Sequence, residues 1–146
     1  MSATNLSLKF TSKFGNVPKQ AGPMEVGYDL ICVKESKRIG SRTIMYDTGI
    51  SVCPPNGYYT EIVPRSSIIK TGYVLSNSTG IIDPTYRGTL RVCLTKIDDT
   101  LPDLELPFCL TQLIIRKMNH LSLTQVETLD ETGRGDGGFG STNPST

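Results

Sequence analysis

The regular recurrence of turn-forming residues is the strongest constraint on how this chain folds. Gly, Pro, Asn and Asp interrupt the sequence at short intervals up to about residue 131. Between them, short segments alternate apolar and polar side chains, which is the two-residue period of a half-buried strand. No segment longer than a few residues keeps the period of about 3.6 residues that a helix requires. The pattern predicts an all-β fold, a jelly-roll-like distorted barrel or sandwich with at most one short helix.

Two hairpins are expected from the spacing of strands and turns. The segments 42–53 and 58–63 flank the turn-forming run at 54–57 and are predicted to pair with each other. A second hairpin is expected around Asp83, with a strand before it and residues 89–94 returning after it. One helical turn is expected, at residues 66–70. The remaining strands are expected at residues 6–10, 28–33, 106–116 and 121–129.

Length, charge and cysteine spacing limit the functional classes. The 146 residues suit one domain with a real core, and the formal charge of +1 gives no global electrostatic reason to bind nucleic acid or a membrane. The chain has no apolar run long enough to span a bilayer and no secretory signal, so we expect an intracellular protein, cytoplasmic or nuclear. Its four cysteines are widely spaced without a Cys-x-x-Cys pair, which predicts reduced thiols rather than a zinc site.

The composition changes sharply after residue 131. Residues 132–146 contain five glycines and one large apolar side chain, Phe139. Such a segment cannot form a core by itself. We therefore predict a β-barrel domain at 1–131 and a flexible, glycine-rich C-terminal tail at 132–146, which closes over an active site that binds a flat, phosphorylated ligand.

Two short stretches have the chemistry to handle such a ligand. Asp83 and Tyr86 stand at the lip of the second hairpin, where backbone N–H and C=O groups can read the edge of a planar base. A carboxylate beside that base can act as a general base toward a bound water. Arg65, Ser66 and Ser67 begin the helical turn, where hydroxyls, free N–H groups and an arginine fork can meet phosphate oxygens.

Five motifs occur in a fixed order along the chain. They are Gly27-Tyr28-Asp29-Leu30, Pro64-Arg65-Ser66-Ser67, Gly80-x-Ile82-Asp83-x-x-Tyr86-x-Gly88, Thr111-Gln112-Leu113-Ile114 and Arg134-Gly135-Asp136-Gly137-Gly138-Phe139-Gly140-Ser141-Thr142. Together they resemble the motifs of the trimeric deoxyuridine triphosphatases, the dUTPase family. The family commonly has glycine where this chain has Ser67.

The resemblance implies a function and a set of substrate contacts. It implies hydrolysis of dUTP to dUMP and pyrophosphate, with Asp83 as the catalytic base for a water that attacks the α-phosphorus. Tyr86 would lie against the deoxyribose, where a ribose hydroxyl would collide with the ring. The implied contacts to the base come from Asn77, Gly80, Ile81, Ile82, Arg91, Phe139 and Gly140.

The resemblance also implies a phosphate site and a metal. Asp29 would hold Mg²⁺ through a bound water, which suits a hard cation that keeps part of its hydration shell. The implied phosphate ligands are Arg65, Ser66, Ser67, Gln112, Arg134, Gly138, Ser141 and Thr142.

The family resemblance further implies a homotrimer whose active sites are shared between subunits. One chain would supply Asp29 and its neighbours, a second chain Asp83, and a third chain the tail. Two alternatives remain at this point. One is a non-catalytic nucleotide-binding or regulatory protein on the same fold, and the other is a dCTP deaminase, which would need a catalytic glutamate in the pocket.

Overall fold

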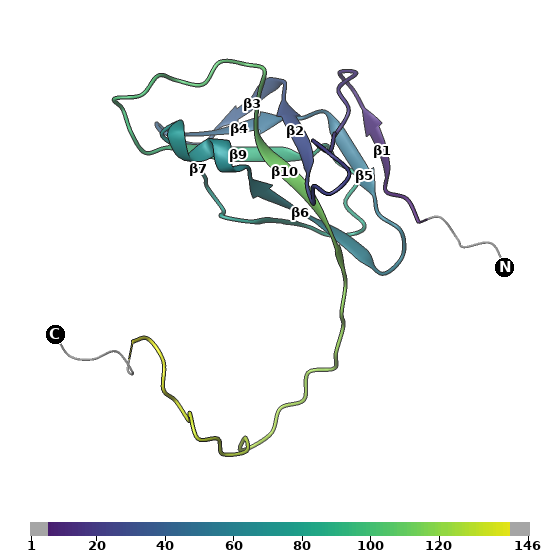
Figure 1. Ribbon diagram of the computed structural model, residues 1–146, viewed down its shortest axis with the longest axis vertical. Helices are drawn as coiled ribbons and strands as arrows, with labels where there is room; N and C mark the ends of the chain where they lie inside the picture. Colours follow the sequence, from purple (N-terminus) through teal and green to yellow (C-terminus); the bar gives the residue numbers. More distant parts are fainter. Residues whose placement is uncertain (1–5, 141–146) are drawn as a thin grey trace.

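The structure, a computed structural model, describes residues 6–140 and confirms the predicted all-β class (Figure 1). Within that range the strands form one two-stranded and two four-stranded sheets, rather than one closed barrel. The strands are β1 (Lys9–Ser12), β2 (Tyr28–Cys32), β3 (Lys34–Arg38), β4 (Thr43–Asp47), β5 (Ile50–Cys53), β6 (Tyr58–Pro64), β7 (Tyr73–Leu75), β8 (Gly80–Ile82), β9 (Arg91–Lys96) and β10 (Phe108–Lys117), with the 3-10 helix η1 (Ser66–Lys70) between β6 and β7.

The two four-stranded sheets enclose the core. Their strand orders are β2-β10-β6-β8 and β3-β4-β9-β7, and every pair is antiparallel. Alternate residues of each strand point inward, as the period of a strand requires. Leu30, Ile62 and Leu113 from the first sheet meet Val92 and Leu94 from the second, and all five are almost completely buried.

The hairpin predicted between residues 42–53 and 58–63 is wrong. The chain breaks at Gly49, which adopts a φ of 70°, and β5 then pairs with β1. β6 lies instead between β10 and β8 in another sheet. Pro54 and Pro55 have no N–H group to donate to a ladder, so the turn that follows directs the chain from one sheet to the next.

The second predicted hairpin is also wrong in its pairing, although the turn is present. The Tyr86 N–H donates to the Asp83 carbonyl at 3.0 Å, which closes a tight turn. However, β8 before the turn pairs with β6, whereas β9 after it pairs with β4 and β7. Asp83 therefore stands on a connection between the two four-stranded sheets.

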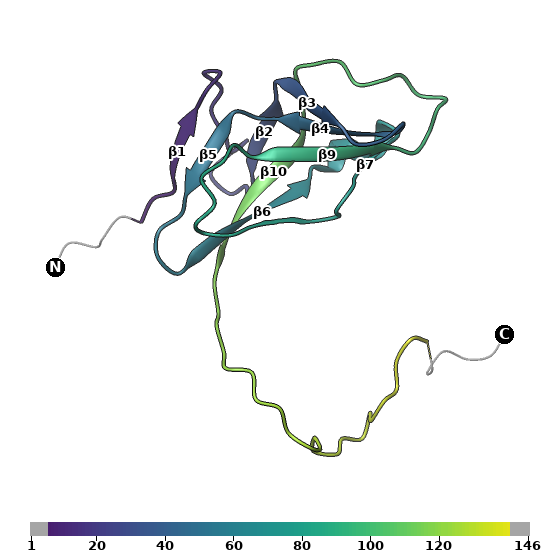
Figure 2. The same ribbon diagram turned by 180° about the vertical axis from the view of Figure 1, so that it is seen from behind.

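Other expected elements are shifted, missing or added. The first strand begins three residues later than predicted, at Lys9, and the charged edge strand β3 was not expected at all. Residues 121–129 form no strand, since the described chain has no partner strand beside them. The predicted helical turn at 66–70 is confirmed as η1. Figure 1 and, from behind, Figure 2 show that the chain leaves the sheets after β10 and runs away from them.

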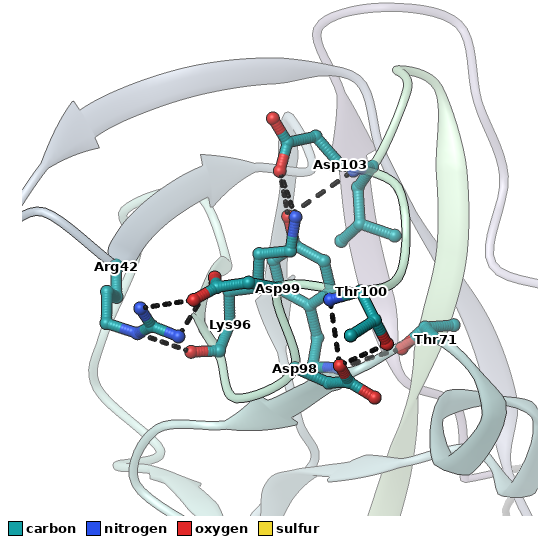
Figure 3. A network of polar contacts seen from close by, with 9 residues as sticks. Arg42, Thr71, Lys96, Asp98, Asp99, Thr100 and Asp103 are labelled. Carbon is teal, nitrogen blue, oxygen red and sulfur yellow. Dashed lines mark hydrogen bonds and ion pairs between the residues drawn. The ribbon is translucent and has the colours of Figure 1, made fainter.

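Ion pairs fix the loop that leads into β10 (Figure 3). Arg42 forks onto the Asp99 carboxylate at 3.0 and 3.1 Å and also donates to the Lys96 carbonyl. Lys96 itself pairs with Asp103 across the loop, and its ammonium lies 5.9 Å from the centre of the Tyr73 ring. The network anchors residues 99–103, in the loop before β10, to the second sheet.

The four cysteines are free thiols. Cys32 is completely buried, and that burial, helped by the nearby Cys109, raises the pKa of its thiol to about 12. A thiol with so high a pKa stays protonated and packs as a small apolar group.

Among residues 6–140, no helix has the length and apolar character to cross a membrane.

A carboxylate on the outer face of the first sheet makes stability depend on pH. Glu61 accepts hydrogen bonds from Arg116 at 2.7 Å and from the Tyr59 hydroxyl at 3.0 Å, and its side chain is only 11% exposed. The bond from Arg116 is the main cause that lowers the pKa of Glu61. A lowered pKa contributes stability that is present above the pKa of the unfolded carboxyl and is lost as the pH falls.

We therefore expect Glu61→Gln to lower the urea midpoint of unfolding at pH 7. The difference from the unsubstituted protein should shrink as the pH falls below about 4.3, the usual pKa of glutamate. The matched control is Glu105→Gln, which removes an exposed carboxylate from the loop before β10. A Glu61→Gln deficit that stays constant from pH 7 to pH 3 would contradict this linkage.

Candidate active site

Four of the predicted phosphate and metal residues gather in one pocket. β2 and β10 pair so that Asp29 stands opposite Gln112, and the segment that leaves β6 brings Arg65 and Ser66 beside them. These four residues line a pocket of about 270 Å³ together with Ala21, Glu25 and Gly27. We call this pocket the phosphate half-site.

An ion pair forms one wall of the phosphate half-site. Arg65 Nε lies 3.1 Å from Asp29 Oδ1, and both side chains are about one third exposed. Arg65 also donates from Nη1 to the Cys109 carbonyl at 2.9 Å. The guanidinium is thus held at the start of β10 with part of its donor set free to face a ligand.

The two serines of the helical turn differ in position. Ser66 is exposed and lines the phosphate half-site, whereas Ser67 does not line it. The Ser67 hydroxyl is buried and has no hydrogen-bond partner in the described part of the chain. The phosphate contact predicted for Ser67 stays a prediction, and the geometry favours Ser66 as the hydroxyl donor.

Gly27 leaves room for Gln112 to enter the phosphate half-site. Gln112 donates from Nε2 to the Pro64 carbonyl at 3.2 Å, which holds its amide beside Gly27. A Cβ at position 27 would overlap the Gln112 amide oxygen and carbon. The glycine is therefore required by the close approach of a side chain and not by a positive φ.

We expect Gly27→Ala to push Gln112 out of the phosphate half-site. The flexible amide can move, so the melting temperature should change little, while turnover of a nucleoside triphosphate should fall by about 10-fold or more. Gly22→Ala is the control, because a Cβ there meets only a Glu25 side-chain carbon at 3.9 Å. Equal activities of the two variants would show that Gln112 has no such role.

A second pocket is lined by five of the predicted substrate-binding and catalytic residues. Ile81 and Ile82 from β8, Asp83 and Tyr86 from the following turn, and Arg91 from β9 line about 370 Å³. Met45 from β4 completes the lining. We call this pocket the nucleoside half-site.

The turn between β8 and β9 fixes the polar groups of the nucleoside half-site. The Tyr86 hydroxyl donates to the Thr89 carbonyl at 3.0 Å, and the ring lies against Gly88, where any Cβ would overlap it. Tyr86 is 41% exposed and Asp83 is exposed, so both can meet a ligand. Asn77 is exposed on the preceding turn, with its amide nitrogen close to buried Gly80, but it does not line the pocket.

The tail lies apart from both half-sites. Arg134 donates from Nε to the Gly137 carbonyl at 2.7 Å and comes near Gly138, within a turn of the tail itself. Phe139 has a positive φ of 51°, and its side chain is completely exposed. Gly140 ends the described chain, and the predicted contacts of Ser141 and Thr142 lie outside the described residues.

The chain therefore brings the predicted residues together in three separate groups. Asp29 stands on β2 and Asp83 follows β8, at opposite edges of the sheet β2-β10-β6-β8. Three strand spacings of about 4.8 Å separate these edges by about 14 Å. Sequence reasoning missed Met45, because an alternating strand residue far from any motif gives no local signal. It also missed Ala21 and Glu25, and it gave no role to Gly27, although Gly27 opens the first motif.

One pocket with candidate phosphate donors and another beside an acidic turn, on an all-β fold, make this chain a candidate nucleotide-binding protein. The sequence matches the dUTPase family over residues 14–143. The chain belongs to the dUTPase family.

Relatives support that membership over nearly the whole length. A deoxyuridine 5'-triphosphate nucleotidohydrolase of Arabidopsis thaliana is 36% identical over 137 residues, which cover 92% of this chain and 81% of the plant protein. The protein of the same name from Rickettsia canadensis is 36% identical over 138 residues, covering 92% of this chain and 93% of its own.

Solved structures show the same fold. A Staphylococcus bacteriophage 80alpha dUTPase mutant with dUpNHpp aligns at a TM-score of 0.68 and 23% identity, over 92% of this chain and 97% of that one. A dUTPase mutant of phage phi11 of S. aureus, described with a structural Mg(II) ion, aligns at a TM-score of 0.68 and 22% identity. The alignment covers 86% of this chain and 99% of that one.

Proposed function

We propose that this protein hydrolyses dUTP to dUMP and pyrophosphate. The observation that carries the proposal is the pair of half-sites, one built for phosphates and one that places a carboxylate beside a pocket of nucleoside size. The relatives that match across the chain are named for this reaction.

The nucleoside half-site selects the substrate. Uracil presents an acceptor, a donor and an acceptor along one edge, which the backbone of β8 at Gly80, Ile81 and Ile82 can match. Cytosine reverses part of this pattern and leaves buried groups unpaired, so its rejection is strong. The Tyr86 ring, held by its bond to the Thr89 carbonyl, excludes a ribose hydroxyl.

Asp83 is the general base of the reaction. Its carboxylate accepts the proton of a water that attacks the α-phosphorus in line. The bond from water to phosphorus forms as the bond to the bridging oxygen breaks, and pyrophosphate leaves. Arg65, Ser66 and Gln112 bind and orient the phosphates through the donors that face the phosphate half-site.

Asp29 suits a magnesium ion bound through water. Its carboxylate is partly exposed in the phosphate half-site, next to the Ser66 hydroxyl and the Gln112 amide. One carboxylate with oxygen-bearing neighbours fits a hard cation that keeps several waters. When bound, magnesium supplies positive charge that offsets the charge developing on the triphosphate oxygens.

The active site is shared between the subunits of a homotrimer. The α-phosphate must lie within a few ångströms of both Asp83 and the donors of the phosphate half-site. In one chain, however, Arg65 and Ser66 follow the end of β6, whereas Asp83 follows Ile82, which pairs with Thr60 near the start of β6. A head-to-tail contact between subunits brings the phosphate half-site of one chain to the nucleoside half-site of the next, and closes as a ring.

The segment after β10 supports assembly as well. Leu121, Leu123, Val126 and Leu129 are between 55% and 100% exposed, within ten residues of chain. Soluble chains rarely leave so many neighbouring apolar side chains in water. A neighbouring subunit covers this segment, and the tail that follows places Phe139 over a uracil and Arg134 near a phosphate.

Two measurements test the proposed function. The first is pyrophosphate release from dUTP, dTTP, dCTP and UTP, in magnesium and in chelator; hydrolysis of dUTP alone, dependent on magnesium, is expected. Tight binding of dUTP without cleavage would instead indicate a nucleotide sensor on this fold. The second is the solution mass by light scattering, which should equal three chains.

A further inference from the structure

Met45 and Arg91 are the two lining residues of the nucleoside half-site that lie outside every motif, and of the two only Arg91 is expected from the sequence. It stands on β4, which pairs with β9 so that Met45 is opposite Cys93 and Asp47 is opposite Arg91. Residues two apart on a strand share a face, so Met45, Cys93 and Arg91 all point outward from the second sheet. We call β8 and the β4–β9 pair, which both contribute lining residues, the two walls of the pocket.

The two walls orient a bound uracil, if the proposed function is accepted. The edge with both carbonyls and N3 faces the backbone of β8 at Ile81 and Ile82, and the sugar lies toward Asp83 and Tyr86. The opposite edge of the ring, with C5 and C6, then faces the β4–β9 wall. C5 is the atom that bears the methyl group of thymine.

We infer that Met45 is the residue that excludes a 5-methyl group, and hence thymine, from the pocket. Two side chains from the β4–β9 wall line the pocket, Met45 and Arg91. Arg91 is exposed and can swing into water, whereas Met45 is half-buried, and its strand is paired on both sides, with β3 and β9. The thioether of Met45 thus occupies the space beside C5.

Thymine is then rejected because its 5-methyl group is too large for the space beside Met45, and not because of its polar groups. Shortening Met45 to alanine removes three heavy atoms from the wall and leaves the backbone groups of β8 unchanged. A methyl-sized change in an apolar pocket alters discrimination by about 10- to 200-fold. Recognition of uracil by its polar edge should survive, because none of those groups belongs to β4.

The test is the ratio of kcat/KM for dTTP to kcat/KM for dUTP in five proteins. Met45→Ala should raise this ratio at least about 10-fold over the unsubstituted protein, and Met45→Leu should leave it nearly unchanged. Val74→Ala is the matched control, since it shortens a 40%-exposed side chain of β7 in the same sheet but outside the pocket. Met45→Val serves as a second shortened variant that keeps a strand-forming residue, should alanine unfold β4.

A binding measurement separates this inference from the proposed function. The affinities of dUMP and dTMP are measured by calorimetry for the same variants, without any turnover. If the unsubstituted protein does not cleave dUTP, the proposed function fails, and the dTMP to dUMP affinity ratio still tests Met45. If dUTP is cleaved but neither shortened variant gains affinity or activity toward the 5-methyl nucleotide, Met45 is not the excluding residue.

Discussion

Asp83→Asn is expected to reduce pyrophosphate release from dUTP by about 10³-fold while leaving nucleotide binding almost intact. The amide keeps the size of the carboxylate but cannot accept the proton of the attacking water. Asp83 is exposed on a turn closed through the backbone, so the substitution removes no packing and should not change the melting temperature. The measurements are initial rates at saturating dUTP and calorimetric affinity for a non-hydrolysable dUTP analogue.

The control for this experiment is Asp98→Asn. Asp98 is an acidic turn residue of similar setting, which accepts hydrogen bonds from the Thr100 backbone and hydroxyl far from either half-site. It should retain full activity. Loss of affinity in Asp83→Asn equal to its loss of rate would show that Asp83 binds substrate and does not act as a base.

Mixing two inactive proteins should restore activity, if the site is shared between subunits. One protein has Asp83→Asn and a complete tail; the other has Asp83 and lacks residues 132–146. Each alone should be nearly inactive. In trimers assembled at random from equal amounts, the chain that supplies Asp83 and the chain that supplies the tail are independent, so about one quarter of the sites should be complete.

The mixed trimers are prepared by co-expression with two different affinity tags and purification on both. A mixture of homotrimers of each protein, combined without exchange, is the control and should stay inactive. Doubly purified trimers with no more activity than that control would contradict a site built from more than one chain.

The sequence predicts the contents of the site better than the paths of the strands. Arg65, Ser66 and Gln112 come from two separate motifs and line one pocket, while their contacts to phosphate stay predictions. Strand pairing, by contrast, is not local in sequence. Residues 58–63 alternate like a hairpin partner for 42–53, yet β6 pairs with β8 and β10 instead.

The misplaced segments share a physical cause. The pattern at 121–129 has the period of a strand, but a strand needs a partner, and none of the described chain lies beside it. Met45 was not predicted as a site residue, because only the register of β4 with β9 brings it to the nucleoside half-site. Ser67 stands inside a motif, yet its hydroxyl is buried away from the pocket that Ser66 lines.

Hydrolysis of dUTP in water enriched in heavy oxygen is the most direct test of the account. Attack of an Asp83-activated water on the α-phosphorus predicts that the label appears in dUMP and that pyrophosphate stays unlabelled. Label in pyrophosphate would place the attack on another phosphorus, and absence of both products would contradict the proposed activity itself.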